Sequence, residues 1–294
     1  MTKADVYMHD MIHEILSDGY RDINPRPKYA DGTPAHTISI NHTCRKYDLN
    51  KNEFPICTLR PQAWKTGIKE IFTIYQKPTN NIATMHEMGV TWWDEWDIGD
   101  GTIGQRYGAT VSRYDLINNL IKDIQNDPYG RRKVVSLWQE QDLHETPGLA
   151  PCAFLTIWNV RNTNRKNLGR GEAYLDMMLI QRSGDMLTAS GPGGINEIQY
   201  ATLLMMIARH TGYKPGVFTH IVANEQIYDR HVEAANEMHR RYQELIDSEN
   251  GIHITKPQLI LNEEKTNFYD MTIEDFKMEN YNPVKPQLTL ELGI

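Results

Sequence analysis

The helix predicted over residues 198–208 constrains the fold most. Among these residues only Gln199, Tyr200 and Thr202 are polar. A helix that is apolar on nearly every face must be covered by other elements on all sides, so we expect it at the centre of the protein, ending at Gly212. The chain is long enough for such a core, because it has 294 residues and 40% of them are hydrophobic.

The other segments predict an α+β protein. Helices are predicted over residues 5–16, where apolar side chains form one stripe, and over 61–75 and 114–126. Apolar or alternating runs predict strands over residues 37–49, 133–138, 153–160 and 172–183. Their mixed order and hairpin-like spacing favour α+β over a strictly alternating parallel sheet. No linker or repeat divides the chain, so we expect residues 1–294 to form one domain.

The charge pattern excludes several classes of protein. A net charge of −7 argues against a nucleic-acid binder, which needs a basic surface, although a few local arginines can still hold a small anion. The longest uncharged stretch, residues 146–160, is too short to span a bilayer and contains two prolines. The start, MTKADVYMHDMIHEIL, carries charge where a secretory signal needs an apolar block, which predicts a cytoplasmic protein.

The three cysteines, Cys44, Cys57 and Cys152, show neither a CxxC pair nor metal-ligand spacing with histidines. This argues against a disulfide framework and a zinc site, and no metal is predicted. Cys152 lies in LAPCAF, between a proline and an apolar strand, a position that can present a thiol at a strand edge. A buried structural cysteine is the alternative, because free cysteines are among the most buried residues.

Two segments carry arginines suited to phosphate. DPYGRRKVV places Arg131 beside Arg132, and QRSGD places Arg182 beside Ser183. Guanidinium groups form paired bonds to phosphate oxygens, and a hydroxyl fills the remaining lone pairs. An arginine near Cys152 would also lower the pKa of its thiol and favour the thiolate. Solvated or salt-bridged surface arginines are the alternative interpretation.

Two further segments allow a generic and a functional interpretation. LTASGPGGIN, before the apolar helix, could bind phosphate through its backbone N–H groups. It lacks the spacing of a P-loop or a GxGxxG motif, so simple flexibility is the generic alternative. The tryptophans of VTWWDEW are either a core corner or a wall for a flat heterocycle.

Nine motifs, in one order along nearly the whole chain, resemble the thymidylate synthase family. They are RPKYADGTPAHTIS, FPICTLRPQAWKTGIKE, VTWWDEW, GDGTIGQRYG, DPYGRRKVVSLW, LAPCAF, QRSGDM, INEIQYATLLMMIA and NFYDMTIEDFKMENY. Each is weak alone, but nine in collinear order are specific. DGTPAHT is similar to the bacterial and phage branch. The resemblance implies a large α+β single domain whose mixed β-sheet forms the interface of an obligate homodimer.

The activity that the resemblance implies is reductive methylation of dUMP by 5,10-methylenetetrahydrofolate, giving dTMP and dihydrofolate. The matching catalytic residues are Cys152, Glu70, Tyr107, Asn196 and Arg182. Cys152 would add to C6 of uracil, because C5 alone is a poor nucleophile. Asn196 would donate to O4 and accept from N3–H. Glu70 would organise water for proton transfers, and Tyr107 would help to remove the C5 proton.

The resemblance also implies two binding sites and no DNA or membrane partner. The residues matching the dUMP site are Arg26, Arg131, Arg132, Arg182, Ser183, Gly184, Asp185, Asn196, Gln226 and Tyr228. Arg131 and Arg132 would reach the phosphate from the partner subunit. The residues matching the folate site are Trp93, Trp96, Asp185 and Gly293, with residues 292–294 closing over the folate.

Several positions depart from the family pattern. Ala153 stands where many relatives have His, Gln226 replaces a ribose-contacting His, and Asn224 replaces an Asp. Gln226 can still bond a hydroxyl, but it carries no charge. The loop LTASGPGGIN is longer than the family's LGxPFN, which alters the wall that faces the folate.

This loop keeps a second activity open. The sister class of deoxynucleotide hydroxymethylases uses the same thiol and folate, but water attacks the methylene instead of a hydride. The alternative is therefore a 5-hydroxymethylase of dUMP or, with less support, of dCMP, since Asn196 favours uracil. A non-catalytic binding relative is a weaker alternative, because Cys152 and Glu70 are both present.

Four other residues are expected to be structural. Cys44 and Cys57 match no role in the family and are predicted to be buried apolar thiols. His220 and His231 are predicted to be histidines with satisfied hydrogen bonds rather than ligands.

Overall fold

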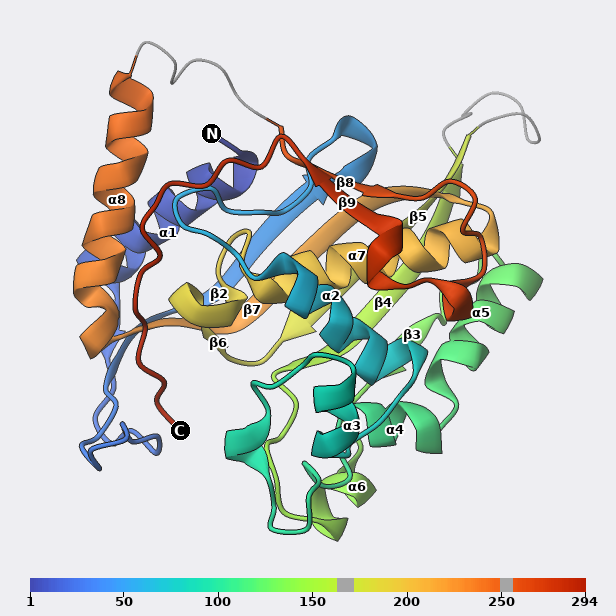
Figure 1. The fold of residues 1–294 in the computed structure, drawn as a ribbon, viewed down its shortest axis with the longest axis horizontal. Coiled ribbons are helices and arrows are strands. Elements are labelled where there is room, and N and C mark those ends of the chain that lie inside the picture. Colours follow the sequence, from blue (N-terminus) through green and yellow to red (C-terminus); the bar gives the residue numbers. More distant parts are fainter. Residues whose placement is uncertain (163–171, 249–255) are drawn as a thin grey trace.

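A mixed seven-stranded sheet forms the body of the protein (Figure 1). The computed structural model describes residues 1–162, 172–248 and 256–294. The strands lie in the order β1-β2-β7-β5-β4-β3, and β6 pairs with β7. Their bounds are β1 Tyr20–Arg21, β2 Thr37–Asp48, β3 Val134–Ser136, β4 Ala153–Asn162, β5 Ala173–Gln181, β6 Gly184–Asp185 and β7 Lys214–Tyr228. β7 runs parallel to β5 and β6, and the other neighbours are antiparallel, which confirms the α+β class.

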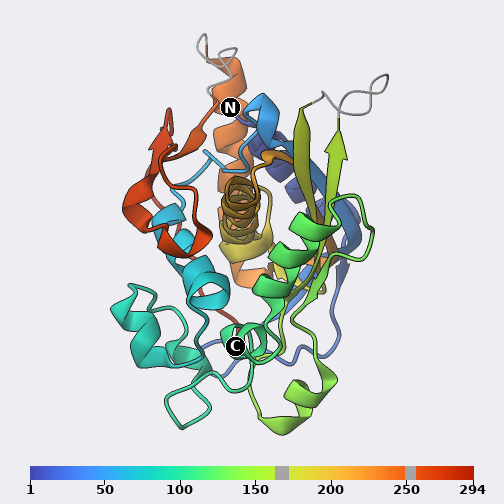
Figure 2. The same ribbon diagram turned by 90° about the vertical axis from the view of Figure 1, so that its right-hand side faces the viewer.

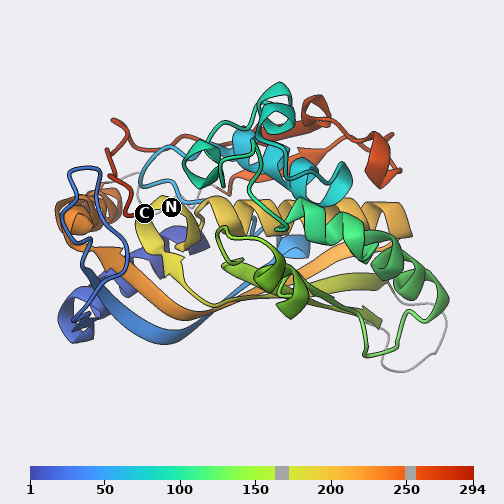
Figure 3. The same ribbon diagram turned by 90° about the horizontal axis from the view of Figure 1, so that it is seen from below.

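Helices cover one face of this sheet, with α2, α5 and α7 lying above it in Figure 3. The helices are α1 Lys3–Asp18, α2 Trp64–Ile71, α3 Ile82–Glu87, α4 Gly108–Arg113, α5 Leu116–Asn126, α6 Glu140–Glu145, α7 Ile195–Thr211 and α8 Val232–Asp247. β8 (Gln258–Leu261) and β9 (Phe276–Glu279) pair antiparallel in a separate two-stranded sheet. Within the described ranges no helix is long and apolar enough to cross a membrane.

Helix α7 lies at the centre of the core, as its composition predicts. Ile198, Ala201 and Leu204 are all fully buried. Figure 2 shows the helix end-on, with α2 on one side and the sheet on the other, and it contacts α2, β5 and β7. Gly212 ends it with a φ of 77°, a left-handed conformation that glycine adopts without strain.

Three predicted elements have different bounds in the structure. The helix predicted over 61–75 begins only at Trp64 and continues as a π-helix over Phe72–Gln76. The helix predicted over 114–126 begins at Leu116, because Asp115 has a left-handed φ of 51° that separates it from α4. The strand predicted over 133–138 is confined to β3, an edge strand that pairs with β4 alone.

The face of the sheet opposite α7 carries a row of apolar side chains. Leu155, Ile180, Ile221 and Cys44 are register partners on the neighbouring strands β4, β5, β7 and β2. The first three are half-buried and Cys44 is exposed. The prediction that Cys44 is buried is therefore wrong, because the alternation of β2 gives the inward position to Arg45. Cys57 is buried, as predicted.

Candidate active site

The thiol of Cys152 lies just before β4 and faces an arginine. Its Sγ atom is 3.4 Å from Nη2 of Arg182, which follows β5. Arg182 also donates to the carbonyls of Ala150 (2.8 Å) and Pro151 (3.0 Å), so it holds the segment that carries the thiol. Burial raises the pKa of Cys152, and Arg182 opposes this rise without outweighing it. The predicted Cys–Arg pair is present, but the predicted fall in thiol pKa is not.

Tyr107 connects Cys152 to the tryptophan wall. Its hydroxyl oxygen accepts from the backbone N–H of Cys152 at 3.3 Å, and its ring meets that of Trp93 edge-on with 4.9 Å between centroids. The backbone of Tyr107 has φ 48° and ψ −108°, a strained combination for a non-glycine residue. Burial raises the pKa of Tyr107 well above its usual value, so its hydroxyl stays neutral and can transfer a proton only in partnership with a base.

Glu70, on α2, is a buried carboxylate between two donors. Its Oε1 atom accepts from Nε1 of Trp93 at 2.7 Å, and its Oε2 atom accepts from Nε2 of Gln199 on α7. Burial raises the pKa of Glu70 to about 7, although hydrogen bonds from Trp93, Gln199 and Trp92 act to lower it. A carboxylate with this pKa can gain and lose a proton near neutral pH, which suits a general acid–base group. Trp96 packs edge-on against Trp93, 5.5 Å between centroids.

Asn196 lies in the first turn of α7, where the glycine-rich loop enters the helix. Its side chain is half-buried and touches two other amides. Its Oδ1 atom accepts from Nε2 of Gln181 at 3.3 Å, and its Nδ2 atom donates to Oε1 of Gln199 at 3.0 Å. An amide that is held in this way leaves one N–H and one oxygen lone pair for a ligand.

Asp185 and His231 form a polar pair with unused bonding capacity. Oδ1 of Asp185 and Nδ1 of His231 are buried, lie 3.7 Å apart, and have no hydrogen-bond partner among the described residues. Nε2 of His231 is 2.7 Å from the carbonyl of Glu291, and Asp185 accepts from the Thr188 hydroxyl. His231 is thus only half satisfied, and the orphaned carboxylate oxygen suits an N–H donor of a ligand.

Residues 292–294 lie beside Tyr228 and the loop around Lys28. Ile294 and Lys28 exchange two backbone hydrogen bonds, of 2.8 and 2.9 Å. A Cβ atom at Gly293 would lie 2.8 Å from the ring of Tyr228, so a side chain there would force the segment away. Burial raises the pKa of Tyr228 to about 12. The residues predicted for ribose and folate at this end therefore share one neighbourhood.

The remaining predicted residues differ in how firmly they are held. Gly184 is held tightly, since a Cβ atom there would overlap Oγ of Ser190, and Asp185 pairs through its backbone with Gln226. The carbonyl of Ser183 accepts from Gln181 at 2.9 Å. Arg26 is exposed, and its charge opposes the rise in the pKa of Cys152.

Arg131 and Arg132 are not brought to Cys152 by contacts within the chain. Both are exposed in the segment before β3. Neither makes a hydrogen bond or ion pair with the part of the chain that the structure describes. Two adjacent unpaired guanidinium groups on the surface are available to an anion or to a second chain.

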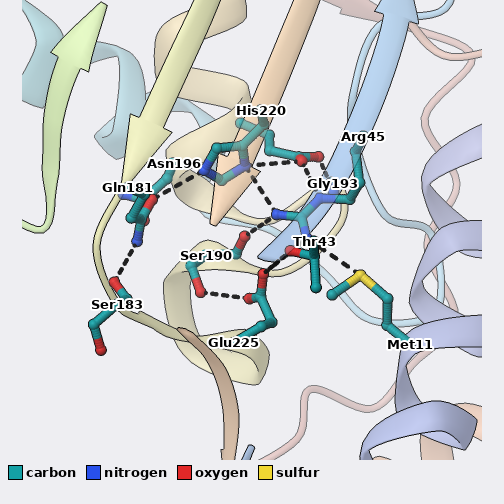
Figure 4. Close-up of polar contacts among 11 residues, drawn as sticks. Met11, Thr43, Arg45, Gln181, Ser183, Ser190, Gly193, Asn196, His220 and Glu225 are labelled. Atoms are coloured by element: carbon teal, nitrogen blue, oxygen red, sulfur yellow. Dashed lines mark hydrogen bonds and ion pairs between the residues drawn. The ribbon is translucent and has the colours of Figure 1, made fainter. Parts of the chain in front are cut away.

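A buried polar cluster behind Asn196 was not predicted from the sequence (Figure 4). Arg45, Glu197 and Glu225 are almost fully buried and ion-paired, and His220 joins them. The available signal was Glu197, a charged residue at the edge of the most apolar segment, because a carboxylate buried there needs a partner. In the described residues no group of His, Cys, Asp and Glu side chains is arranged to hold a metal ion.

Comparisons with known proteins identify the family of the chain. Residues 6–293 match the family model described as thymidylate synthase. Proteins named thymidylate synthase from Streptococcus pneumoniae (strain 70585) and Streptococcus suis (strain 05ZYH33) are 44% and 43% identical, over 100% of this chain and of theirs. The solved structure of thermostable thymidylate synthase A from Bacillus subtilis has a TM-score of 0.82 and 31% identity, covering 99% of each chain. The chain belongs to the thymidylate synthase family.

Proposed function

We propose that this chain is a thymidylate synthase, which converts dUMP to dTMP with 5,10-methylenetetrahydrofolate as one-carbon donor and reductant. The observation that carries the proposal is the continuous contact among the predicted catalytic residues. Cys152 contacts Arg182 and Tyr107, and Tyr107 packs on Trp93. Trp93 donates to Glu70, which reaches Asn196 through Gln199. These contacts connect residues that are far apart in the sequence, which supports their assignment to one site.

The chemistry follows from the residue types. The thiolate of Cys152 adds to C6 of uracil, and the electron pair moves towards C5 and O4. Asn196 donates its free N–H to O4, where charge develops, and accepts from N3–H with its free lone pair. Arg182, 3.4 Å from the sulfur, favours the charged thiolate as long as an incoming phosphate does not displace it from the segment that carries Cys152.

Proton movements fall to Tyr107 and Glu70. The Tyr107 oxygen is 3.3 Å from the backbone nitrogen of Cys152, so it would lie near a pyrimidine bound to this thiol and would assist removal of the C5 proton. Glu70 can hold or release a proton near neutral pH, because its pKa is about 7. In this proposal Cys152 is the nucleophile, Asn196 is the amide that reads the base, and Glu70 is the proton acceptor.

The residues present fit a folate. Oδ1 of Asp185 is a buried acceptor without a hydrogen bond among the described residues, as a pterin N–H requires, and the half-buried ring of Trp96, packed on Trp93, would offer a flat apolar surface. When bound, the folate supplies the one-carbon unit and the reducing hydride. Gly293 and its neighbours would close over it from the side of Tyr228.

We also propose that the enzyme is a homodimer that shares its phosphate site. The row of Leu155, Ile180 and Ile221 is an apolar surface on the face opposite α7, and a second copy of the chain would cover it. Arg131 and Arg132, free on the surface, would then reach the phosphate in the partner's site. Mixing Arg131→Glu with Cys152→Ala chains, both inactive alone, should restore about a quarter of the normal activity through the mixed dimer.

The proposed reaction is tested by incubating the protein with dUMP and methylenetetrahydrofolate and following dihydrofolate absorbance and nucleotide mass together. A methylated nucleotide with one dihydrofolate per turnover supports the synthase, and Cys152→Ala must abolish both. A hydroxymethylated nucleotide with tetrahydrofolate refutes it in favour of the hydroxymethylase. Failure of complementation in a verified mixed dimer refutes only the shared phosphate site.

A further inference from the structure

A line of hydrogen bonds leads from the buried Arg45 to Asn196 and on to Glu70. Its first part is drawn in Figure 4. Arg45, on β2, is 1% exposed and is neutralised by Glu197 (Nε–Oε1, 2.6 Å) and Glu225 (Nη1–Oε2, 2.8 Å). Its Nη2 atom, which also donates to the Ser190 carbonyl, lies 2.9 Å from Nδ1 of His220. A guanidinium group can only donate, whereas the Glu197 carboxylate, 3.1 Å from the same nitrogen, can only accept, so the direction of the line is fixed at its other bonds.

The direction of the next bonds is fixed at the Ser183 carbonyl. Burial and the charge of Arg45 lower the pKa of His220, although Glu197, 3.1 Å from Nδ1, opposes this. Nε2–H of His220 donates to Oε1 of Gln181 at 3.1 Å. Nε2 of Gln181 then donates to Oδ1 of Asn196 at 3.3 Å and to the Ser183 carbonyl at 2.9 Å. Since a carbonyl only accepts, Ser183 fixes the same orientation of the Gln181 amide independently.

The second part runs from Asn196 to the acid–base carboxylate. Nδ2 of Asn196 donates to Oε1 of Gln199 at 3.0 Å, and Nε2 of Gln199 donates to Oε2 of Glu70. An ionised carboxylate only accepts, so Glu70 fixes the Gln199 amide from the far end. Every bond from His220 to Glu70 therefore has the same polarity.

We propose that Gln199 is a positioning residue that joins the base-reading amide of Asn196 to the carboxylate of Glu70. This rests on the proposed function, because it assigns Asn196 to the pyrimidine and Glu70 to proton transfer. Gln199 is buried on α7 and uses its amide for both bonds. If the Asn196 amide rotated by half a turn, two N–H groups would face each other at Gln181 and two oxygens at Gln199. The line thus holds Asn196 in the orientation that matches uracil, whereas the rotated amide matches cytosine.

Gln199 also lowers the pKa of Glu70. The donor bond from Gln199 stabilises the ionised carboxylate, and Trp93 and Trp92 do the same from the loop before α4. The titratable groups that face Glu70 from α7 and from the start of α4 are Tyr200 and Tyr107, and both are neutral hydroxyls because burial raises their pKa values. Loss of the Gln199 donor should therefore raise the pKa of Glu70 further.

The test uses Gln199→Met, which keeps the side-chain length and removes both polar atoms. Gln199→Asn, which keeps an amide that is too short to bridge, is the second variant in case the first does not fold. Thr202→Val is the matched control, because Thr202 is equally buried on α7 and its hydroxyl bonds only the Ile198 carbonyl. The Glu70 carboxyl is titrated by NMR after ¹³C-glutamate labelling, with Glu70→Gln to assign the signal. Equilibrium binding of dUMP and of dCMP is measured on the same proteins.

We expect the Glu70 pKa to rise by about one to two units in the Gln199 variants and to stay unchanged in Thr202→Val. We expect the preference for dUMP over dCMP to fall by about tenfold in the Gln199 variants alone. An unchanged Glu70 titration or an unchanged nucleotide preference overturns the proposal. If the unmodified protein makes no methylated nucleotide, the proposed function fails, and the titration of Glu70 still decides whether Gln199 holds this carboxylate.

Discussion

The burial of Glu70 predicts a stability that depends on pH. Its pKa rises from the usual 4.5 to about 7 in the folded protein, so the folded state holds a proton that the unfolded state releases over this range. The protonated carboxyl contributes stability that is fully present below about pH 4.5 and is lost as the pH rises through about 7. At 1.36 kcal/mol per unit, the loss amounts to about 3 kcal/mol.

The perturbation is Glu70→Gln, which removes the titration but keeps the shape of the side chain. Free energies of unfolding are measured by urea denaturation at fixed protein concentration between about pH 5 and about pH 8. The difference between the variant and the unmodified protein should move by about 2.5 kcal/mol in favour of the variant over this range, because part of the loss has already occurred at about pH 5. Only the change with pH is interpreted, because the amide also places an N–H opposite Trp93 or Gln199, a cost that does not vary with pH.

Glu14→Gln, the same substitution on the exposed face of α1, controls for the change of residue type. A difference for Glu70→Gln that stays constant within about 1 kcal/mol over the range would refute the reasoning. It would mean that the two donors, Trp93 and Gln199, compensate for the burial of the carboxylate.

Three further predictions concern the thiols and the segment beside Tyr228. Arg182→Lys keeps the charge but cannot contact both the Cys152 segment and the sulfur. Alkylation of Cys152 at about pH 8 should therefore slow by about tenfold, with unchanged circular dichroism. Equal rates would contradict the role of the guanidinium. Removing residues 292–294 deletes the hydrogen bonds to Lys28. In steady-state kinetics, KM for methylenetetrahydrofolate should rise by about tenfold, while dUMP binding should change by less than about twofold. No rise in KM would exclude closure by this segment. Cys44 should react with a thiol reagent only at dilutions where light scattering reports single chains, and mass spectrometry maps the reaction. A reaction rate that does not depend on dilution would exclude an interface over Cys44.

Local patterns in the sequence were sufficient for the elements but not for all side chains. The apolar composition of residues 198–208 placed α7 correctly, because burial on every face is a property of the segment itself. Cys44 was misplaced, because the residue type suggests burial while the alternation of β2 turns it outwards. The left-handed backbone of Tyr107 has no local signal, since the packing of Trp93 and Cys152 around it, and not its own preference, holds the conformation.

The candidate site, too, could be predicted from the sequence only in part. Motif resemblance identified Cys152, Glu70 and Asn196, and the structure brings them together through Tyr107, Trp93 and Gln199. The cluster of Arg45, Glu197 and Glu225 was missed, because its members come from β2, α7 and β7 and meet only in the folded protein. A single sequence shows which charges exist, but their pairing depends on the register of β2 against β7.

The position of α7 has a consequence for how the chain reaches its folded state. The segments that cover it are far apart in the sequence: α2 and β5 precede α7, β7 follows it, and β7 pairs with β2 near the start of the chain. Until these distant segments meet, a helix that is apolar on every face stays exposed to water and to other chains. Association between partly folded molecules therefore competes with folding, and inactivation by heat is expected to be irreversible and to depend on the rate of heating.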